Sequence, residues 1–106
     1  MKRRNIFSER VLELALAIPK GRVTTYGRLA REAGGGALAA QSITTILWKA
    51  EQRGVKDIPY HRIVYADGRV WMNKDCAPKR LALYRKERIK LDEDARIVDF
   101  KKKLLY

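Results

Sequence analysis

The sequence contains a single cysteine, Cys76, and a single histidine, His61. One thiol cannot form a disulfide within the chain, so a disulfide-stapled fold is excluded and an intracellular location, in cytoplasm or nucleoid, is expected. One histidine and one cysteine are also too few for a zinc ligand set. We therefore predict no metal site and no cofactor.

Long apolar runs are missing as well. None approaches the roughly 20 residues that a helix needs to cross a bilayer. The apolar stretch Leu12 to Ile18 is interrupted by Glu13 and followed by Pro19. This stretch is typical of an amphipathic helix rather than of a signal sequence, and we expect no membrane partner.

Acidic residues are scarce relative to basic ones. The 106 residues include 24 Lys+Arg and 12 Asp+Glu, which gives a net charge of +12. Such a charge attracts polyanions, of which nucleic acid backbones are the most common, although a merely soluble or heat-adapted surface would have a similar composition. Hydrophobic residues make up 46% of the chain, enough for one globular domain with a modest core.

The apolar spacing predicts three helices in the first half of the chain. The first covers about residues 5–18, the second begins at Thr24 or Thr25 as N-cap, and the third covers about residues 38–52. Gly34-Gly35-Gly36 separates the last two. Two short helices joined by a glycine-rich turn are typical of a helix-turn-helix, in which the second helix of the pair contacts DNA. The expected buried stripe of that helix consists of Ala39, Ile43, Ile46, Leu47 and Ala50.

The sequence of the second half of the chain predicts a β-hairpin and one more helix. Asp67-Gly68 is a strong turn signal between Val64-Tyr65 and Val70-Trp71, and the last helix covers about residues 77–86. The basic tail, residues 91–106, has no pattern that assigns a structure. The expected fold is mainly α, a winged helix-turn-helix-like single domain over residues 1–106, with a core at about 6–90 and a short β-hairpin as the wing.

Three stretches together resemble the O6-alkylguanine-DNA alkyltransferases. Residues 18–30 read IPKGRVTTYGRLA, which is similar to the "IPxGxVxTYGxLA" segment of the DNA-binding domain of that family. Residues 58–64 read IPYHRIV, which is similar to the active-site segment "IPCHRVV", and YADG at 65–68 resembles the turn that follows it. The order and spacing also agree, and the resemblance covers roughly residues 6 to 90.

Tyr60 stands where those enzymes carry the cysteine that accepts the alkyl group. A phenol has a pKa near ~10 and lacks the nucleophilicity of a thiolate, and the adjacent His61 does not make up that difference. The resemblance therefore points to the alkyltransferase-like branch, whose members lack the cysteine and bind O6-alkylguanine without removing the alkyl group. Some members hand the lesion to nucleotide excision repair. Cys76 could be a nucleophile displaced from that position, but a buried or incidental thiol is the favoured interpretation.

The resemblance also assigns the residues that contact DNA. They are Thr25, Tyr26, Ala39, Ala40, Gln41, Ser42 and Thr44. Tyr26 matches a tyrosine that helps to rotate the nucleotide, with a half-buried core aromatic as the alternative, and the small alanines allow a helix to approach the minor groove. Gln41 replaces the family's arginine finger, and Thr44 replaces a glycine. Trp48 stands at a usually polar or basic site, where its helical spacing favours packing in the core.

The lesion pocket is expected to consist of Leu47, Tyr60, Val70, Trp71 and Met72. Trp71 could stack on a flipped base, as aromatic side chains do with unstacked bases, or it could fill the pocket and close it. A further set of residues, Pro59, His61, Arg62 and Glu87, is expected to be structural. Within this set we expect a hydrogen bond between His61 and Glu87.

These observations predict a monomeric, non-enzymatic protein that binds double-stranded DNA. It would recognise O6-alkylguanine by helix-turn-helix binding in the minor groove and by base flipping, without alkyl transfer, with nucleotide excision repair proteins as candidate partners. The alternative is a general winged-helix DNA-binding protein that has lost lesion recognition. A transferase that uses Tyr60 or Cys76 is the third and least favoured hypothesis.

Overall fold

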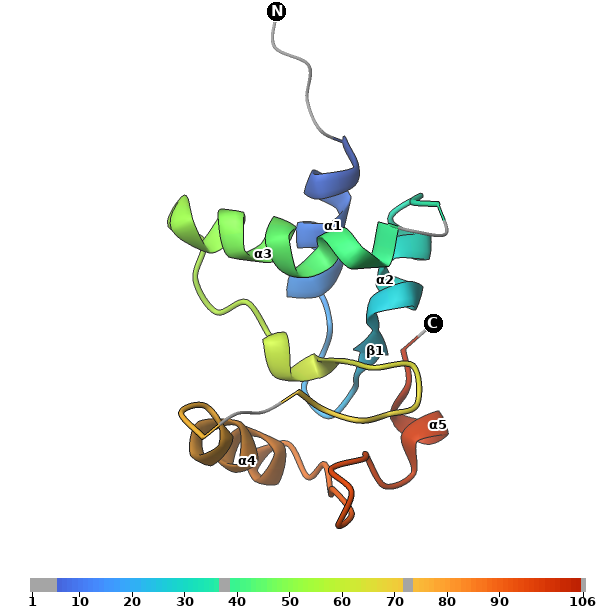
Figure 1. Cartoon of the computed structure of the whole chain (residues 1–106), viewed down its shortest axis with the longest axis vertical. Helices are drawn as coiled ribbons and strands as arrows, with labels where there is room; N and C mark the ends of the chain where they lie inside the picture. The colour runs from blue at the N-terminus through green and yellow to red at the C-terminus, as the bar shows by residue number, and fades with distance from the viewer. Residues whose placement is uncertain (1–5, 37–38, 72–73, 106) are drawn as a thin grey trace, which may run out of the picture.

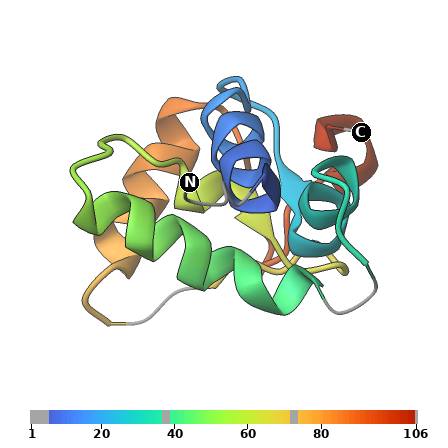
Figure 2. The same cartoon turned by 90° about the horizontal axis from the view of Figure 1, so that it is seen from above.

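Three helices in the first half of the chain pack around one apolar core (Figure 1). The structure, a computed structural model, describes residues 6–36, 39–71 and 74–105. The helices are α1 (Ile6–Leu16), α2 (Tyr26–Glu32) and α3 (Ile43–Gln52), and a short 3-10 helix, η1 (Ala39–Ser42), leads into α3. The three predicted helices are therefore present, and the third begins with a 3-10 turn. Figure 2 shows α3 along one side of the molecule, with α1 and α2 behind it.

The buried face of α3 is the one that its apolar spacing indicates. Ile43, Leu47 and Ala50 are buried, and Ile46 is partly buried. They pack with Val11, Ala15 and Ile18 from the α1 region, with Leu29, Ala30 and Ala33 from the α2 region, and with Ile58 and Ile63. Because this side of α3 is used for packing, its opposite side faces outward.

The start of α2 is set by a cap and by a short parallel sheet. Thr25 is the N-cap, and its Oγ1 accepts a hydrogen bond from the N–H of Arg28 at 3.1 Å. The strand β1 (Thr24–Thr25) pairs in parallel with β2 (Ile63–Val64), with Thr24 opposite Ile63 and Thr25 opposite Val64. The 3-10 helix η2 (Tyr60–Arg62) comes directly before β2. The pairing therefore places the segment that contains Tyr60 beside the N-terminus of α2.

The predicted β-hairpin is wrong in its pairing, although its turn exists. The N–H of Gly68 donates to Tyr65 O, and the N–H of Tyr65 donates to Arg69 O, both at 2.9 Å. However, the first arm of the hairpin pairs with β1, and the second arm pairs with the C-terminal segment: Arg69 forms an antiparallel bridge with Arg96, and the N–H of Val70 donates to the carbonyl O of Ala95. The local turn signal was correct, but it carried no information on these distant partners.

A second apolar core joins the sheet to the C-terminal part of the chain. The helices here are α4 (Ala77–Lys86), as predicted, and the short α5 (Phe100–Lys103). Val23, Val64, Val70, Tyr84, Ile89 and Ile97 form this core. Val23 exchanges backbone hydrogen bonds with Lys103 and Leu105, at 2.9 and 2.7 Å. The segment that the sequence left unassigned thus packs against the start of β1. None of the helices in the described residues is long and apolar enough to cross a membrane.

Candidate nucleic-acid interface

One exposed face of η1 and α3 carries Gln41, Thr44 and Trp48. Residues three and four apart lie on the same side of a helix. These three side chains therefore point away from the core that the other side of α3 buries. Trp48 is 55% exposed, so the expectation that it packs in the core is wrong.

A cavity of about 670 Å³ lies against this face. Six of the residues that the sequence predicted at the DNA interface or in the lesion pocket line it: Tyr26, Ala40, Gln41, Thr44, Tyr60 and Trp71. They come from α2, η1, α3, η2 and the segment that precedes α4. Residues far apart in the sequence thus meet in one cavity beside the outward face of the helix-turn-helix.

Two residues assigned to the lesion pocket do not line this cavity. Leu47 is fully buried in the first core, and Val70 is buried in the second. Leu47 faces inward because successive helix positions turn by about 100°, which leaves its neighbour Trp48 on the outer side. Met72 lies outside the described residues.

Trp71 forms a wall of the cavity and is 45% exposed. Its ring lies against Arg80, whose guanidinium carbon is 5.3 Å from the ring centroid. Nη1 of Arg80 also donates to the backbone O of Trp71 at 3.0 Å. These two contacts hold the indole at the edge of the cavity, so Trp71 does not fill it.

Tyr26 is the half-buried aromatic of one of the two alternatives that the sequence left open, and its position leaves the other, contact with DNA, a prediction. It is partly buried against the first core, and it also lines the cavity. Its ring centroid lies 5.9 Å from that of Tyr65, another residue of the cavity wall. Thr25, in contrast, is buried and its hydroxyl caps α2. The DNA contacts expected of Tyr26, of Thr25 and of the η1 and α3 residues all stay predictions.

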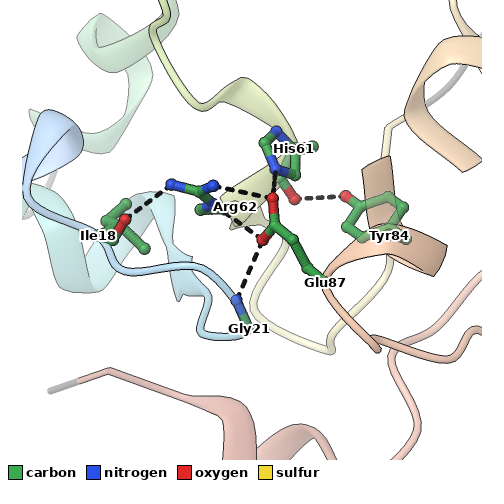
Figure 3. A network of polar contacts seen from close by, with 6 residues as sticks. All are labelled: Ile18, Gly21, His61, Arg62, Tyr84 and Glu87. Carbon is green, nitrogen blue, oxygen red and sulfur yellow. Dashed lines mark hydrogen bonds and ion pairs between the residues drawn. The ribbon is translucent and has the colours of Figure 1, made fainter. Parts of the chain in front are cut away.

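The carboxylate of Glu87 is the centre of a polar network behind the cavity (Figure 3). Nε2 of His61 lies 2.6 Å from Oε2, Nη2 of Arg62 donates to Oε2 at 2.8 Å, and Nε of Arg62 donates to Oε1 at 3.0 Å. The N–H of Gly21 donates to Oε1 at 3.1 Å. The expected hydrogen bond between His61 and Glu87 is therefore present. Its role is to join η2 to the end of α4.

Two further contacts extend this network to the backbone. Nη1 of Arg62 donates to Ile18 O at 2.8 Å, and the hydroxyl of Tyr84 donates to His61 O. Pro59 and His61 are both buried. The segment on either side of Tyr60 is thus fixed to α4 and to the turn after α1, which gives the Tyr60 ring a defined place in the cavity wall.

The network shifts the pKa of both titratable partners. Burial alone would raise the pKa of Glu87, but hydrogen bonds from Arg62, His61 and the Gly21 N–H outweigh it and lower this pKa to about 2. Burial lowers the pKa of His61, and the hydrogen bond with Glu87 opposes that shift. The structure therefore favours a neutral imidazole beside an ionised carboxylate. The described residues contain no group of three or more His, Cys, Asp or Glu that could hold a metal.

Three further residues that were not predicted from the sequence also line the cavity: Glu51, Tyr65 and Arg80. For Arg80 a signal existed. Arg80, Tyr84 and Glu87 are spaced by four and three residues along α4 and its end, so they share one face of the helix. Once Glu87 was assigned to the site, this spacing could have placed Arg80 there too.

The chain matches a family model over residues 6–89, that of the DNA-binding domain of 6-O-methylguanine DNA methyltransferase. It is 34% identical over 84 residues to the DNA base-flipping protein of Escherichia coli strain K12. This match covers 78% of the chain and 63% of the relative, so the chain spans somewhat less than two thirds of that protein.

Solved structures show the same fold. Atl1 of S. pombe, in complex with damaged DNA that contains O6-carboxymethylguanine, superposes over 99% of both chains with a TM-score of 0.73 and 18% sequence identity. The O6-methylguanine methyltransferase of Mycobacterium tuberculosis superposes over 81% of this chain and 50% of the enzyme, with a TM-score of 0.58 and 24% identity. The match of the family model over most of the chain shows that this protein belongs to the family of the 6-O-methylguanine DNA methyltransferase DNA-binding domain.

Proposed function

We propose that this protein binds duplex DNA and accepts a flipped O6-alkylguanine in the cavity beside α3, without taking up the alkyl group. The observation that carries the proposal is the meeting of Tyr26, Gln41, Tyr60 and Trp71 in one cavity. Aromatic side chains stack on unstacked bases, and this stacking stabilises binding by about 1–3 kcal/mol per base. The likeness to two other proteins, a DNA base-flipping protein and Atl1 in complex with damaged DNA, supports the same function.

The outward face of η1 and α3 is the surface that we propose for DNA. Gln41 and Thr44 are exposed there and line the cavity. The side chain of Ala40 is small, so it leaves room for DNA to approach η1 closely. Flipping a base costs a few kcal/mol, and a side chain that fills the vacated space in the duplex offsets part of that cost. Gln41 is the residue for this task. It carries no charge, so we expect it to be a weaker plug than arginine.

The environment of Tyr60 argues against alkyl transfer. Burial and the nearby Glu51 carboxylate raise the pKa of Tyr60, and the charge of Arg80 only partly opposes this. A phenol with a raised pKa forms less phenolate at neutral pH, so it is a poorer nucleophile than a free phenol. We therefore propose that Tyr60 stacks on or packs against the lesion. Intact-mass spectrometry after incubation with alkylated DNA tests this: no added alkyl mass is expected, and an added mass would contradict it.

The main test is the affinity for matched duplexes with and without one O6-methylguanine, measured by fluorescence anisotropy at several salt concentrations. Salt must vary because phosphate contacts contribute equally to both duplexes and hide the discrimination at low salt. We expect tighter binding to the lesion duplex at every salt concentration. Equal affinity throughout would contradict lesion recognition and would favour a general winged-helix DNA-binding protein.

Two matched variants on the same exposed surface refine the test. Gln41→Ala removes the proposed plug, and Thr45→Ala truncates an exposed neighbour that does not line the cavity. We expect Gln41→Ala to weaken lesion binding several-fold and Thr45→Ala to change it little. An equal effect of the two would remove the special role of Gln41.

Because the alkyl group would stay on the guanine, its removal must come from other proteins. We propose nucleotide excision repair proteins as these partners and a monomer as the DNA-binding form. Light scattering of the protein alone and with lesion duplex tests the stoichiometry. Incision of a lesion duplex by purified excision repair proteins, measured with and without this protein, tests the partnership: faster incision is expected, and unchanged incision would contradict it.

A further inference from the structure

Arg80 brings a positive charge into the wall of the cavity. Among the described residues that line it, Arg80 is the one lysine or arginine. Its guanidinium is held in place by the ring of Trp71 at 5.3 Å and by the backbone O of Trp71 at 3.0 Å. A charge that is fixed before a ligand arrives loses little freedom when the ligand binds.

Arg80 forms no ion pair with the described residues. Glu87 pairs with His61 and Arg62, and Asp67 pairs with Arg69 and Arg96, so neither of these acids neutralises Arg80. Glu51, which also lines the cavity, is not ion-paired with Arg80. Burial raises the pKa of Tyr26, and the charge of Arg80 acts in the opposite direction, as it does at Tyr60. The field of Arg80 thus reaches two of the phenols that line the cavity, those of Tyr26 and Tyr60.

We propose that Arg80 determines the substituent specificity of this cavity, so that O6 substituents that carry a carboxylate bind more tightly than neutral substituents of the same size. This inference rests on the proposed function. A guanidinium has five N–H donors, and one hydrogen bond of Arg80 is used by the carbonyl of Trp71. The remaining donors can bind a carboxylate by charge-assisted hydrogen bonds, which are about twice as strong as neutral ones.

Glu51 also lines the cavity, and its negative charge reduces the preference for a carboxylate substituent. Its carboxylate repels an anionic substituent, whereas Arg80 attracts it. The attraction is the stronger effect because it combines charge with directed hydrogen bonds from a fixed donor, while the repulsion acts only through space. Removal of the Glu51 charge should therefore increase the preference for a carboxylate.

The test compares three duplexes that differ at one base: guanine, O6-carboxymethylguanine and O6-carbamoylmethylguanine. The last is a neutral amide of nearly the same shape as the carboxylate. We expect the wild-type protein to bind the carboxymethyl duplex roughly tenfold more tightly than the carbamoylmethyl duplex. Equal affinities for the two would overturn the inference.

Three variants separate the role of Arg80 from that of overall charge. Arg80→Gln removes the cavity charge, Arg85→Gln removes an equal charge from an exposed position of α4 outside this cavity, and Glu51→Gln removes the opposing charge. Arg80→Gln should abolish the tenfold preference, Arg85→Gln should keep it, and Glu51→Gln should enlarge it. A preference that survives Arg80→Gln, or that is lost equally in Arg85→Gln, would overturn the inference.

Arg80→Lys provides a rescue that a merely structural role would not give. It keeps the charge but loses the planar group that stacks on Trp71, so part of the carboxylate preference should return. Failure of the proposed function has a different signature from failure of this inference. If neither modified duplex binds more tightly than the guanine duplex, the proposed function fails. If both bind more tightly but equally, only the role of Arg80 fails.

Discussion

Nε2 of His61 lies 2.6 Å from Oε2 of Glu87, although the two residues are 26 positions apart in the sequence. This contact ties η2, which carries Tyr60, to the end of α4, which carries Arg80. Arg62 binds the same carboxylate through two nitrogens. The elements that carry Tyr60 and Arg80, two residues of the cavity wall, are therefore joined by one buried carboxylate.

Glu87→Gln should destabilise the protein strongly. The side chain of Glu87 is 3% exposed and that of Arg62 is 14% exposed, so the variant leaves a largely buried cation without its counter-charge. We expect the free energy of unfolding to fall by about 3 kcal/mol. Urea denaturation measures this. Asp67→Asn, which removes the carboxylate of the exposed pair with Arg69, is the control and should have a far smaller effect.

The stability should also fall in acid because of Glu87. Its pKa is about 2 in the folded protein, below the ordinary value of 4.5, so the unfolded chain takes up this proton first as the pH falls. The contribution is complete above pH 4.5 and is lost between about 4.5 and 2. Denaturation across this range should show the loss in the wild type and a flatter profile in Glu87→Gln. An equal dependence of stability on pH in the two proteins would show that Glu87 is not the cause of the acid destabilisation.

His61 should add a second pH dependence at higher pH. Its pKa in the folded protein lies below the ordinary 6.5 because of burial, so protonation also favours the unfolded chain. Stability should be complete above pH 6.5 and should decrease as the pH falls below it. Since the chain has one histidine, NMR of its imidazole protons gives the pKa directly. A value above 6.5 would show that the ion pair with Glu87 outweighs burial.

Gly35 should be far less tolerant of alanine than Gly36. A Cβ at Gly35 would lie 2.5 Å from Cβ of Ala39 and 2.6 Å from a ring carbon of Phe7, so the turn before η1 would have to move. We expect Gly35→Ala to cost about 1–3 kcal/mol of stability. A Cβ at Gly36 meets no heavy atom within 4 Å in the described structure, so Gly36→Ala is the matched control and should be nearly neutral. Thermal denaturation of both variants distinguishes them, and equal losses would contradict the steric explanation.

Substitution by valine should change the stability of the protein in opposite directions at Thr24 and at Thr25. Oγ1 of Thr24 is buried and has no hydrogen-bond partner among the described residues, whereas Oγ1 of Thr25 caps α2. Thr24→Val removes an unsatisfied buried hydroxyl and should stabilise the protein by about 1 kcal/mol. Thr25→Val removes the cap and should destabilise it by about 1 kcal/mol. Melting temperatures measure both, and a stability loss in Thr24→Val would show that its hydroxyl has a partner.

The family pattern and the helices could be predicted from the sequence because both depend on local features. Three local features follow from residues within a few positions of one another: an N-cap at Thr24 or Thr25, which the structure places at Thr25, the glycine turn at residues 34–36, and the range of α4. The resemblance assigned Tyr26 and Gln41 to the DNA contacts and Tyr60 and Trp71 to the lesion pocket. The structure gathers all four around one cavity.

The predictions that failed concern contacts between distant segments. The turn at Asp67-Gly68 suggested that its two flanks pair with each other, but β2 pairs with β1 and Arg69 pairs with Arg96. Trp48 has the helical spacing of a core residue, yet it points outward, because Leu47 beside it occupies the core side of α3. Spacing alone cannot decide between two adjacent apolar residues when the packing partner is unknown.

The sequence by itself determined the charge of the protein, the helices α1 to α4 and the presence of Tyr60 where the resemblance places a reactive cysteine, because each is a property of single residues or of short segments. Only the tertiary structure decided that Trp71 is held at the edge of the cavity and that Arg80 lies against it. The position of a cavity wall depends on how α3, α4 and η2 pack together. That packing is set by the apolar cores and by the Glu87 network, which join residues across the whole chain.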